Sequence, residues 1–139
     1  MGFLKGFLLT VVTIGLLGCG NDSPINVGLH YDNEGSLSAP VSLTPGAVTS
    51  AHGGEGTSYY YALVSPSTTY TVTVIMQTYD RVVLRVHKGG FSSPVACTSD
   101  TGGSKEECNV TMTALESSLY IEVTNNNTVF GTPFTITVH

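Results

Sequence analysis

The sequence predicts an all-β protein, built as a single antiparallel β-sandwich of roughly seven to nine strands with an immunoglobulin-like or jelly-roll arrangement. Three observations support this prediction. Apolar and polar residues alternate in a series of short segments, residues that favour turns separate these segments, and helical periodicity is nearly absent after about residue 20. The chain has 139 residues, which suits one domain.

Residues 1–18 have the pattern of a secretory signal peptide that precedes the fold. Lys5 is followed by an uncharged, mostly apolar run over 7–17, too short to span a bilayer as a stable helix. The run ends in Leu16-Leu17-Gly18-Cys19, which resembles the cleavage box of bacterial lipoproteins. This resemblance implies that Cys19 becomes the first residue and carries acyl chains such as palmitate. A transmembrane anchor and a secreted protein cleaved elsewhere are the alternatives.

Acylation at Cys19 predicts a membrane-anchored protein. Each buried CH₂ contributes about 0.8 kcal/mol, so two or three chains together hold a protein at a membrane. Gly20, and not Asp, follows the cysteine. In the sorting pattern of Gram-negative lipoproteins this residue implies export to the cell outer membrane, with the periplasmic or surface face left open.

Residues 19–38 are interpreted as the lipidated cysteine and a flexible tether, because they are polar, contain glycine and lack periodicity. Asp32, Asn33 and Glu34 offer oxygen ligands within this segment. An EF-hand needs a longer acidic register closed by a bidentate Glu, which this segment does not have. We therefore predict no metal site and no cofactor, and place the folded domain at residues 39–139.

The folded domain opens with two short strand candidates, 40–44 and 47–50, and then the glycine-rich segment 53–56. Residues 59–88 read as three consecutive strands, because apolar side chains recur at every second position and successive side chains of a strand point to opposite faces. The residues expected on one face of these strands are Tyr70, Val72, Val74 and Met76, then Val82, Leu84 and Val86.

Cys97 and Cys108 are predicted to form a structural disulfide, since the third cysteine is assigned to lipid and the exported chain meets oxidising conditions. Gly102-Gly103 marks a hairpin tip between them. The crosslink closes a loop of about a dozen residues and contributes roughly 2–3 kcal/mol. A metal site needs more ligands, and a redox pair needs Cys-x-x-Cys spacing.

Two further strands complete the expected sandwich. The first, near 119–124, alternates apolar and polar residues and ends at the asparagines 125–127, and the last, near 134–138, runs to the terminus. The apolar face of these two strands is predicted to consist of Leu119, Ile121 and Val123, followed by Phe134, Ile136 and Val138.

The order of these features resembles the bacterial pre-peptidase C-terminal (PPC) domain, a small β-sandwich appended to secreted proteases and other exported proteins. The resemblance covers about 40–139, and its matching segments are 56–61, 69–74, 83–86 after Asp80, 118–123, and 134–138 after Gly131. It implies a β-sandwich without catalytic activity. Asp80 is followed by Arg81 and Val82, where the family often has a further acidic residue, so the resemblance carries no cation site here.

Charge and motif content exclude other classes of function. A net charge of −5 and the lack of a basic cluster argue against nucleic acid as a partner. His52, Glu55 and Ser58 lie near one another in the sequence, but a glycine-rich loop is a poor place to hold a general base. His30 with Asp32 lies in no recognised catalytic motif either, and His87 is expected to point to solvent. The protein is therefore predicted not to be an enzyme.

Three aromatic residues are the candidate ligand contacts: Tyr60, Tyr79 and Phe91. Aromatic rings stack on sugars or grip peptide side chains with few rotatable bonds, although such rings also cover the edges of a sandwich. We predict a non-catalytic accessory or binding domain of the cell envelope, with polysaccharide or exported protein as the class of partner. An adhesin or envelope-assembly component, and a hydrolase with an unrecognised site, are the alternatives; the oligomeric state is left open.

Overall fold

The computed structural model describes residues 32–77, 81–126 and 132–139, and this part of the chain contains strands and no helix. Its nine strands are β1 (Val41–Leu43), β2 (Val48–Gly53), β3 (Gly56–Leu63), β4 (Thr69–Met76), β5 (Val82–Lys88), β6 (Val95–Ser99), β7 (Lys105–Thr111), β8 (Ser118–Asn125) and β9 (Thr132–Val138). The all-β prediction and the expected range of strand number are confirmed.

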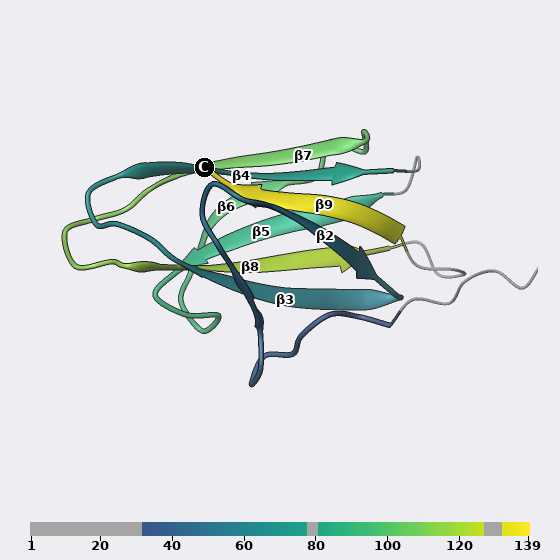
Figure 1. Ribbon diagram of the computed structural model, residues 1–139, viewed down its shortest axis with the longest axis horizontal. Coiled ribbons are helices and arrows are strands. Elements are labelled where there is room, and N and C mark those ends of the chain that lie inside the picture. Colours follow the sequence, from purple (N-terminus) through teal and green to yellow (C-terminus); the bar gives the residue numbers. More distant parts are fainter. Residues whose placement is uncertain (1–31, 78–80, 127–131) are drawn as a thin grey trace, which may run out of the picture.

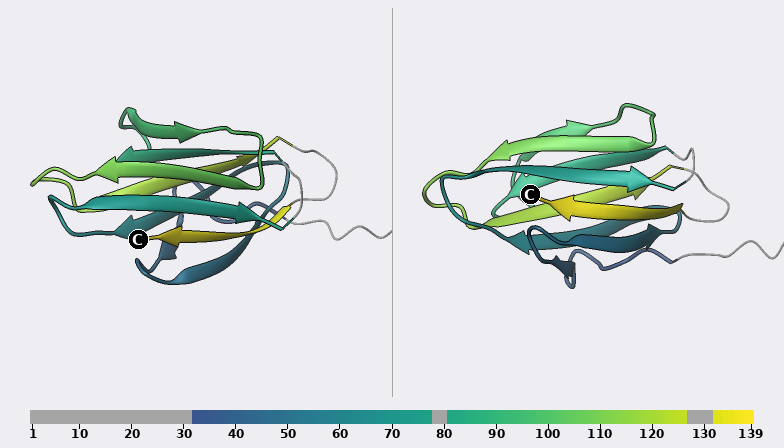
Figure 2. Two further views of the ribbon diagram at one scale, coloured as in Figure 1. Left: turned by 90° about the horizontal axis from the view of Figure 1, so that it is seen from above. Right: turned by 45° about the horizontal axis from the view of Figure 1, so that its top comes forward.

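The strands form two sheets packed face to face, as Figure 1 and Figure 2 show. One sheet has five strands in the order β1-β3-β8-β5-β6, and the other has four in the order β2-β9-β4-β7. All pairings are antiparallel except that of β1 with β3, which is parallel. The sandwich is thus antiparallel as predicted, with one short parallel edge strand.

The core lies between the sheets and is filled by the alternating residues that the sequence pattern marks. Strands β4, β5, β8 and β9 each contribute three buried apolar side chains at every second position. These residues are Val72, Val74, Met76, Val82, Leu84, Val86, Leu119, Ile121, Val123, Phe134, Ile136 and Val138. Period-two burial follows from strand geometry, so the predicted inward faces are confirmed.

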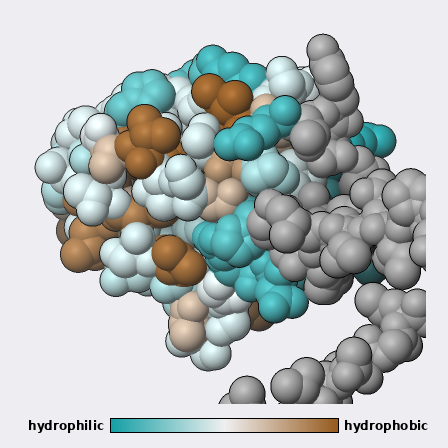
Figure 3. Space-filling model, turned by 45° about the vertical axis from the view of Figure 1, so that its right-hand side comes forward, coloured by the Kyte–Doolittle hydropathy of each residue, from teal (hydrophilic) through white to brown (hydrophobic). Residues whose placement is uncertain are grey.

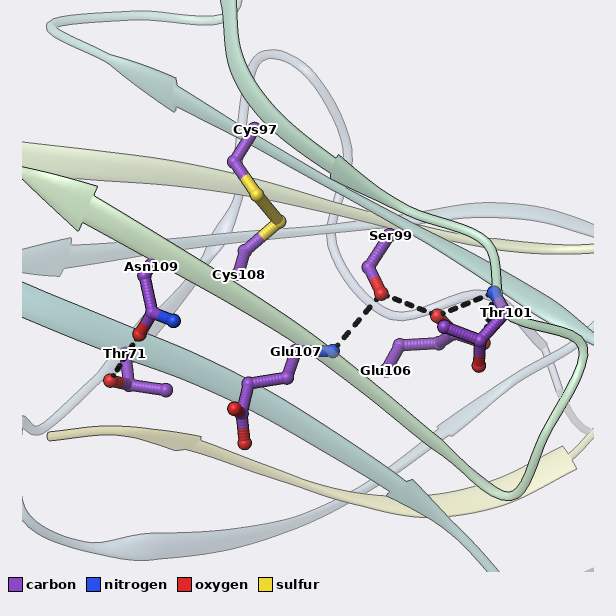
Figure 4. Close-up of a disulfide and its surroundings, with 8 residues drawn as sticks. All are labelled: Thr71, Cys97, Ser99, Thr101, Glu106, Glu107, Cys108 and Asn109. Atoms are coloured by element: carbon purple, nitrogen blue, oxygen red, sulfur yellow. Dashed lines mark hydrogen bonds between the residues drawn. A yellow bond between two sulfur atoms is a disulfide. The ribbon is translucent and has the colours of Figure 1, made fainter.

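A disulfide joins Cys97 and Cys108, with 5.8 Å between their Cα atoms, which confirms the predicted pairing. The prediction of a hairpin within one sheet is wrong, because β6 is the edge of the five-stranded sheet and β7 the edge of the four-stranded sheet. The turn between them carries the chain from one layer to the other. The disulfide therefore links the two layers at one side of the sandwich (Figure 4).

Glu106 on β7 is a fully buried carboxylate beside this disulfide. Its oxygens accept hydrogen bonds from the Ser99 hydroxyl at 2.6 Å, the Thr101 hydroxyl at 2.9 Å and the Thr101 backbone N–H at 3.0 Å. Figure 4 shows these groups around one turn of the chain. A buried charge is tolerated when hydrogen bonds replace its hydration, and here they join the end of β6 to the start of β7.

The folded domain begins before residue 39. The sequence pattern assigns residues 32–38 to a flexible tether, but the structure attaches them to β3. The Glu34 carbonyl accepts the Tyr59 N–H at 2.8 Å, and the Glu34 N–H donates to the Ser58 hydroxyl at 3.0 Å. Polar composition alone does not distinguish a tether from a segment that pairs along a sheet edge, so the predicted boundary is several residues too late.

The predicted signal peptide, Cys19 and His30 lie outside the described residues. In the described ranges, no helix is long and apolar enough to cross a membrane. On the side of the molecule in Figure 3, apolar residues form separate spots among pale and teal ones. Scattered exposure of this kind is ordinary on protein surfaces. The large apolar residues that are exposed are Leu37, Val48, Leu63, Ile75, Val95 and Leu115.

Candidate functional site

Aromatic side chains gather on the outer face of the five-stranded sheet. Tyr59 and Tyr61 lie on β3, and Tyr120 lies opposite Tyr61 on the neighbouring strand β8. The rings of Tyr61 and Tyr120 stack with centroids 6.4 Å apart and planes 29° apart. We call Tyr59, Tyr61 and Tyr120 the tyrosine face, and Phe91 packs against it from the β5–β6 loop.

The hydroxyls of Tyr59, Tyr61 and Tyr120 make no hydrogen bond within the described part of the protein. All three side chains are half-buried, so each ring has neighbours on one side and solvent on another. Rings of this kind combine apolar area with a polar tip and lose little conformational entropy when a ligand binds. The tyrosine face therefore offers both stacking and hydrogen bonding from a rigid sheet.

Tyr60 does not belong to this face, and its prediction as a ligand contact is wrong. Its side chain is 0% exposed and lies in the core, where its ring meets Phe134 edge-on at 6.3 Å. Ala62 and Ser58 share its inward parity on β3, whereas Tyr59 and Tyr61 point outward. Which of these side chains point inward depends on the pairing of β3 with β8, and the sequence of β3 alone does not reveal that pairing.

The Tyr60 hydroxyl reaches the end of the core and donates to Glu34 Oε2 at 3.0 Å. Burial, and then the charge of Glu34 with this hydrogen bond, raise the pKa of Tyr60 above its usual range. The other oxygen of Glu34 lies 3.0 Å from His52 Nδ1 on β2. Glu34 thus connects the segment before β1 to both β2 and β3.

Replacing Tyr60 with phenylalanine is expected to cost about 1–2 kcal/mol of stability near neutral pH, because a hydrogen bond to a carboxylate is lost. Since the folded state holds the Tyr60 proton more tightly than the unfolded state, this tyrosine favours folding below a pH of about 10 and loses its contribution as the pH rises further. Urea unfolding at pH 8 and at about pH 11 measures both effects. Tyr61→Phe, whose hydroxyl makes no hydrogen bond within the described residues, is the control, and an equal alkaline loss in wild type and Tyr60→Phe contradicts this account.

Phe91 and Tyr79, the other two candidates, have different outcomes. Phe91 is half-buried, and its ring meets Tyr59 edge-on at 5.2 Å and Tyr120 at 5.0 Å. Phe91 therefore belongs to the aromatic cluster. The sequence prediction did not include its neighbours Tyr59 and Tyr120 as ligand contacts. Tyr79 lies outside the described residues. Tyr120 has its own signal, because it alternates with the inward residues Leu119 and Ile121 and so must point outward.

His87 lies under this cluster, and the expectation that it points to solvent is wrong. Its side chain is 6% exposed, because the β5–β6 loop folds over it. His87 Nδ1 lies 2.8 Å from the Ser93 carbonyl oxygen, and Nε2 lies 3.4 Å from Glu122 Oε1 without forming a hydrogen bond. A shift of register between Val86 and His87 on the β6 side accompanies this arrangement.

The residues considered as catalytic candidates make structural contacts instead. His52 pairs with Glu34, the Ser58 hydroxyl accepts the Glu34 N–H and is buried, and Glu55 accepts a hydrogen bond from Asn33 through its backbone carbonyl. This arrangement does not present the Ser58 hydroxyl to a substrate. Over 32–77, 81–126 and 132–139, no group of three or more His, Cys, Asp and Glu side chains is placed to hold a metal ion.

The arrangement defines a small β-sandwich with an aromatic outer face. Comparison with solved structures identifies a known domain with a similar fold. The chain matches the pre-peptidase C-terminal domain of a collagenase from Bacillus anthracis with a TM-score of 0.62 and 13% identity, covering 78% of this chain and all of that domain. This likeness shows that the chain has the PPC fold, as the sequence resemblance implies.

A second solved structure is PliG of Aeromonas hydrophila, a periplasmic inhibitor of g-type lysozyme. It matches with a TM-score of 0.48 and 15% identity over 73% of this chain and all of that one. No family model and no curated protein sequence matches this chain.

Proposed function

We propose that this chain is a non-catalytic lipoprotein of the cell envelope, anchored through Cys19, whose β-sandwich binds a partner through the tyrosine face. The partner classes are polysaccharide and exported protein. The observation that carries the proposal is the cluster of outward rings on one sheet, in which three tyrosine hydroxyls make no hydrogen bond within the described residues.

The geometry of the fold supports this role. The described chain starts at Asp32, near the end of the sandwich where β2 ends and β3 begins (Figure 1), and Phe91 packs on Tyr59 further along β3. The span from residue 19 to residue 32 is 32 − 19 = 13 residues, which reaches at most about 45 Å when extended. A tether of this length therefore allows the sandwich to stand away from a membrane that holds Cys19.

The comparison supports an accessory role rather than a catalytic one. The solved domain with the same fold is described as the pre-peptidase C-terminal domain of a collagenase, so that sandwich is one part of a larger protein. Applied to this chain, the likeness favours an accessory domain without catalytic activity of its own. An acidic chain without a basic cluster has no evident means of binding nucleic acid.

Replacing Tyr61 and Tyr120 together with alanine is expected to weaken partner binding at least about tenfold, since aromatic anchors at the centre of an interface carry most of its binding energy. Binding of the full-length protein to purified envelope polysaccharides and to purified exported proteins is measured. Ile75→Ala, an exposed apolar residue on the other sheet, is the matched control. Equal binding by the tyrosine variant and this control contradicts the proposed surface.

Replacing Cys19 with serine is expected to remove the acyl chains and move the protein from the membrane fraction to the wash, because a hydroxyl cannot form the thioether. Metabolic labelling with a radioactive fatty acid and fractionation of the cells measure both changes. Gly20→Ala is the control, which keeps the sulfur nucleophile. Retention of label in Cys19→Ser places the lipid elsewhere and refutes the anchor.

A further inference from the structure

The β5–β6 loop, residues 89–94, covers part of the tyrosine face. Gly90 and Ser93 close a turn through a 3.1 Å hydrogen bond, and Phe91 follows Gly90 within it. Gly89 and Gly90 have φ values of +80° and +155°, in the region that other residues rarely adopt. Phe91 is the only large apolar side chain of the loop, so its edge contacts with Tyr59 and Tyr120 are the apolar attachment that holds the loop down.

Beneath Phe91 lies a buried polar atom, His87 Nε2, that makes no hydrogen bond within the described part of the chain. A carbonyl oxygen only accepts, so the short contact of His87 Nδ1 with the Ser93 carbonyl places a proton on Nδ1. In the neutral ring Nε2 is then an acceptor, and it faces Glu122 Oε1, another acceptor, at 3.4 Å. A buried polar atom left unsatisfied is destabilising, so this position lacks a hydrogen-bond donor.

The other groups around His87 do not supply that donor. Tyr120 and Glu122 approach from β8, Arg85 lies on β5 opposite Glu122, and Phe91 packs on the imidazole from the loop, with centroids 6.1 Å apart. The loop itself, Gly-Gly-Phe-Ser-Ser-Pro, carries no charge. A ligand that enters from the tyrosine face can supply a hydroxyl donor to Nε2 of the neutral ring.

We propose that the tyrosine face is a covered binding site for a neutral polysaccharide, an inference that rests on the proposed function and names its ligand class. The sugar chain displaces Phe91, stacks its C–H faces on Tyr59 and Tyr120, and donates a hydroxyl hydrogen bond to His87 Nε2. Phe91 is then a cover that competes with the ligand, and not a contact.

A polysaccharide fits this site better than a protein does. A pyranose ring has an apolar face and, at its edge, hydroxyl donors, which match flat rings bordered by the acceptors His87 Nε2 and Glu122. The acidic chain and Glu122 disfavour a sugar that carries carboxylates or phosphates, because like charges repel. The site therefore selects for uncharged sugar units.

Titration calorimetry of the full-length protein in detergent, with cellohexaose, maltohexaose and chitohexaose as probes, tests the proposal. Phe91→Ala is expected to bind the preferred probe about tenfold more tightly, because two aromatic contacts no longer have to be broken. Tyr120→Ala is expected to bind at least about tenfold more weakly. Ile75→Ala is the control and is expected to match wild type.

The outcomes separate this inference from the proposed function. Weaker binding by Phe91→Ala overturns the cover, because Phe91 is then part of the contact surface. If neither wild type nor Phe91→Ala binds any of the three sugars, the polysaccharide assignment fails. In that case tyrosine-dependent binding of an exported protein keeps the proposed function, and its absence removes both.

The role of His87 is tested separately by its ¹⁵N chemical shift, which sugar binding would not change if the histidine were purely structural. In protein labelled with ¹⁵N, the Nε2 resonance of His87 is expected to shift when the preferred hexasaccharide is added, and the resonance of His52, which lies on the other sheet, is expected to stay. An unchanged Nε2 resonance at saturating sugar overturns the proposed hydrogen bond.

Discussion

Replacing Glu106 with alanine is expected to lower the free energy of unfolding by about 2–4 kcal/mol. The change leaves the Ser99 hydroxyl and the Thr101 N–H without their acceptor, while the Thr101 hydroxyl keeps the Lys105 carbonyl at 3.2 Å, and an unsatisfied buried polar group costs about 1–3 kcal/mol. It also leaves a space among inward-facing residues. These hydrogen bonds hold the end of β6 to the start of β7, so their loss destabilises the turn that connects the two sheets.

Urea unfolding of Glu106→Ala against wild type measures this cost. Glu107→Ala is the matched control, because Glu107 is the next residue on β7, is exposed and pairs with Lys105 at the surface. Lys105 lowers the pKa of Glu107, but an exposed ion pair is screened by solvent, so this variant is expected to stay close to wild type. Equal stability of the two variants is the result that contradicts a structural role for Glu106.

Removing the disulfide by replacing Cys97 and Cys108 with alanine is expected to cost about 3 kcal/mol. With a sequence separation of 11, the chain-entropy estimate gives about this value for the crosslink. The disulfide also stabilises the native state directly, because it joins the edge strands of two different sheets. Cys108 is fully buried, so the alanine variant also loses the packing of its sulfur atoms.

Unfolding of wild type with and without a reducing agent, beside the double variant, separates these contributions. Reduction is expected to destabilise wild type and to leave the double variant unchanged, since the variant has no Cys97–Cys108 bond to break. Coincident unfolding curves for oxidised and reduced wild type would show that the disulfide contributes nothing to stability.

The elements of this fold follow from local pattern. Strands such as β8, with Leu119, Ile121 and Val123 at every second position, are specified by periodicity, because burial on one face of a sheet demands that spacing. The Cys97–Cys108 pair was predicted from the count of cysteines and their exported context. The connection between sheets was not, since a glycine turn looks the same in a hairpin and in a crossing between layers.

The candidate site was predicted only in part. Phe91 was identified, but Tyr60 was assigned to the surface and Tyr59, Tyr61 and Tyr120 were not assigned to it. Three consecutive tyrosines fit either parity, so the sequence gives no preference for which of them point inward. The burial of His87 depends on the β5–β6 loop lying across the sheet, a contact that strand periodicity does not describe.

The sequence by itself determined the all-β class, the inward residues of the central strands and the disulfide pair, because alternation and cysteine number act locally or by elimination. Only the tertiary structure decided which tyrosines share a face, that Glu34 belongs to the domain, and that Phe91 packs on His87. These facts depend on contacts between segments far apart in the chain. Such contacts follow from how the sheets pair and pack, and local pattern leaves that choice open.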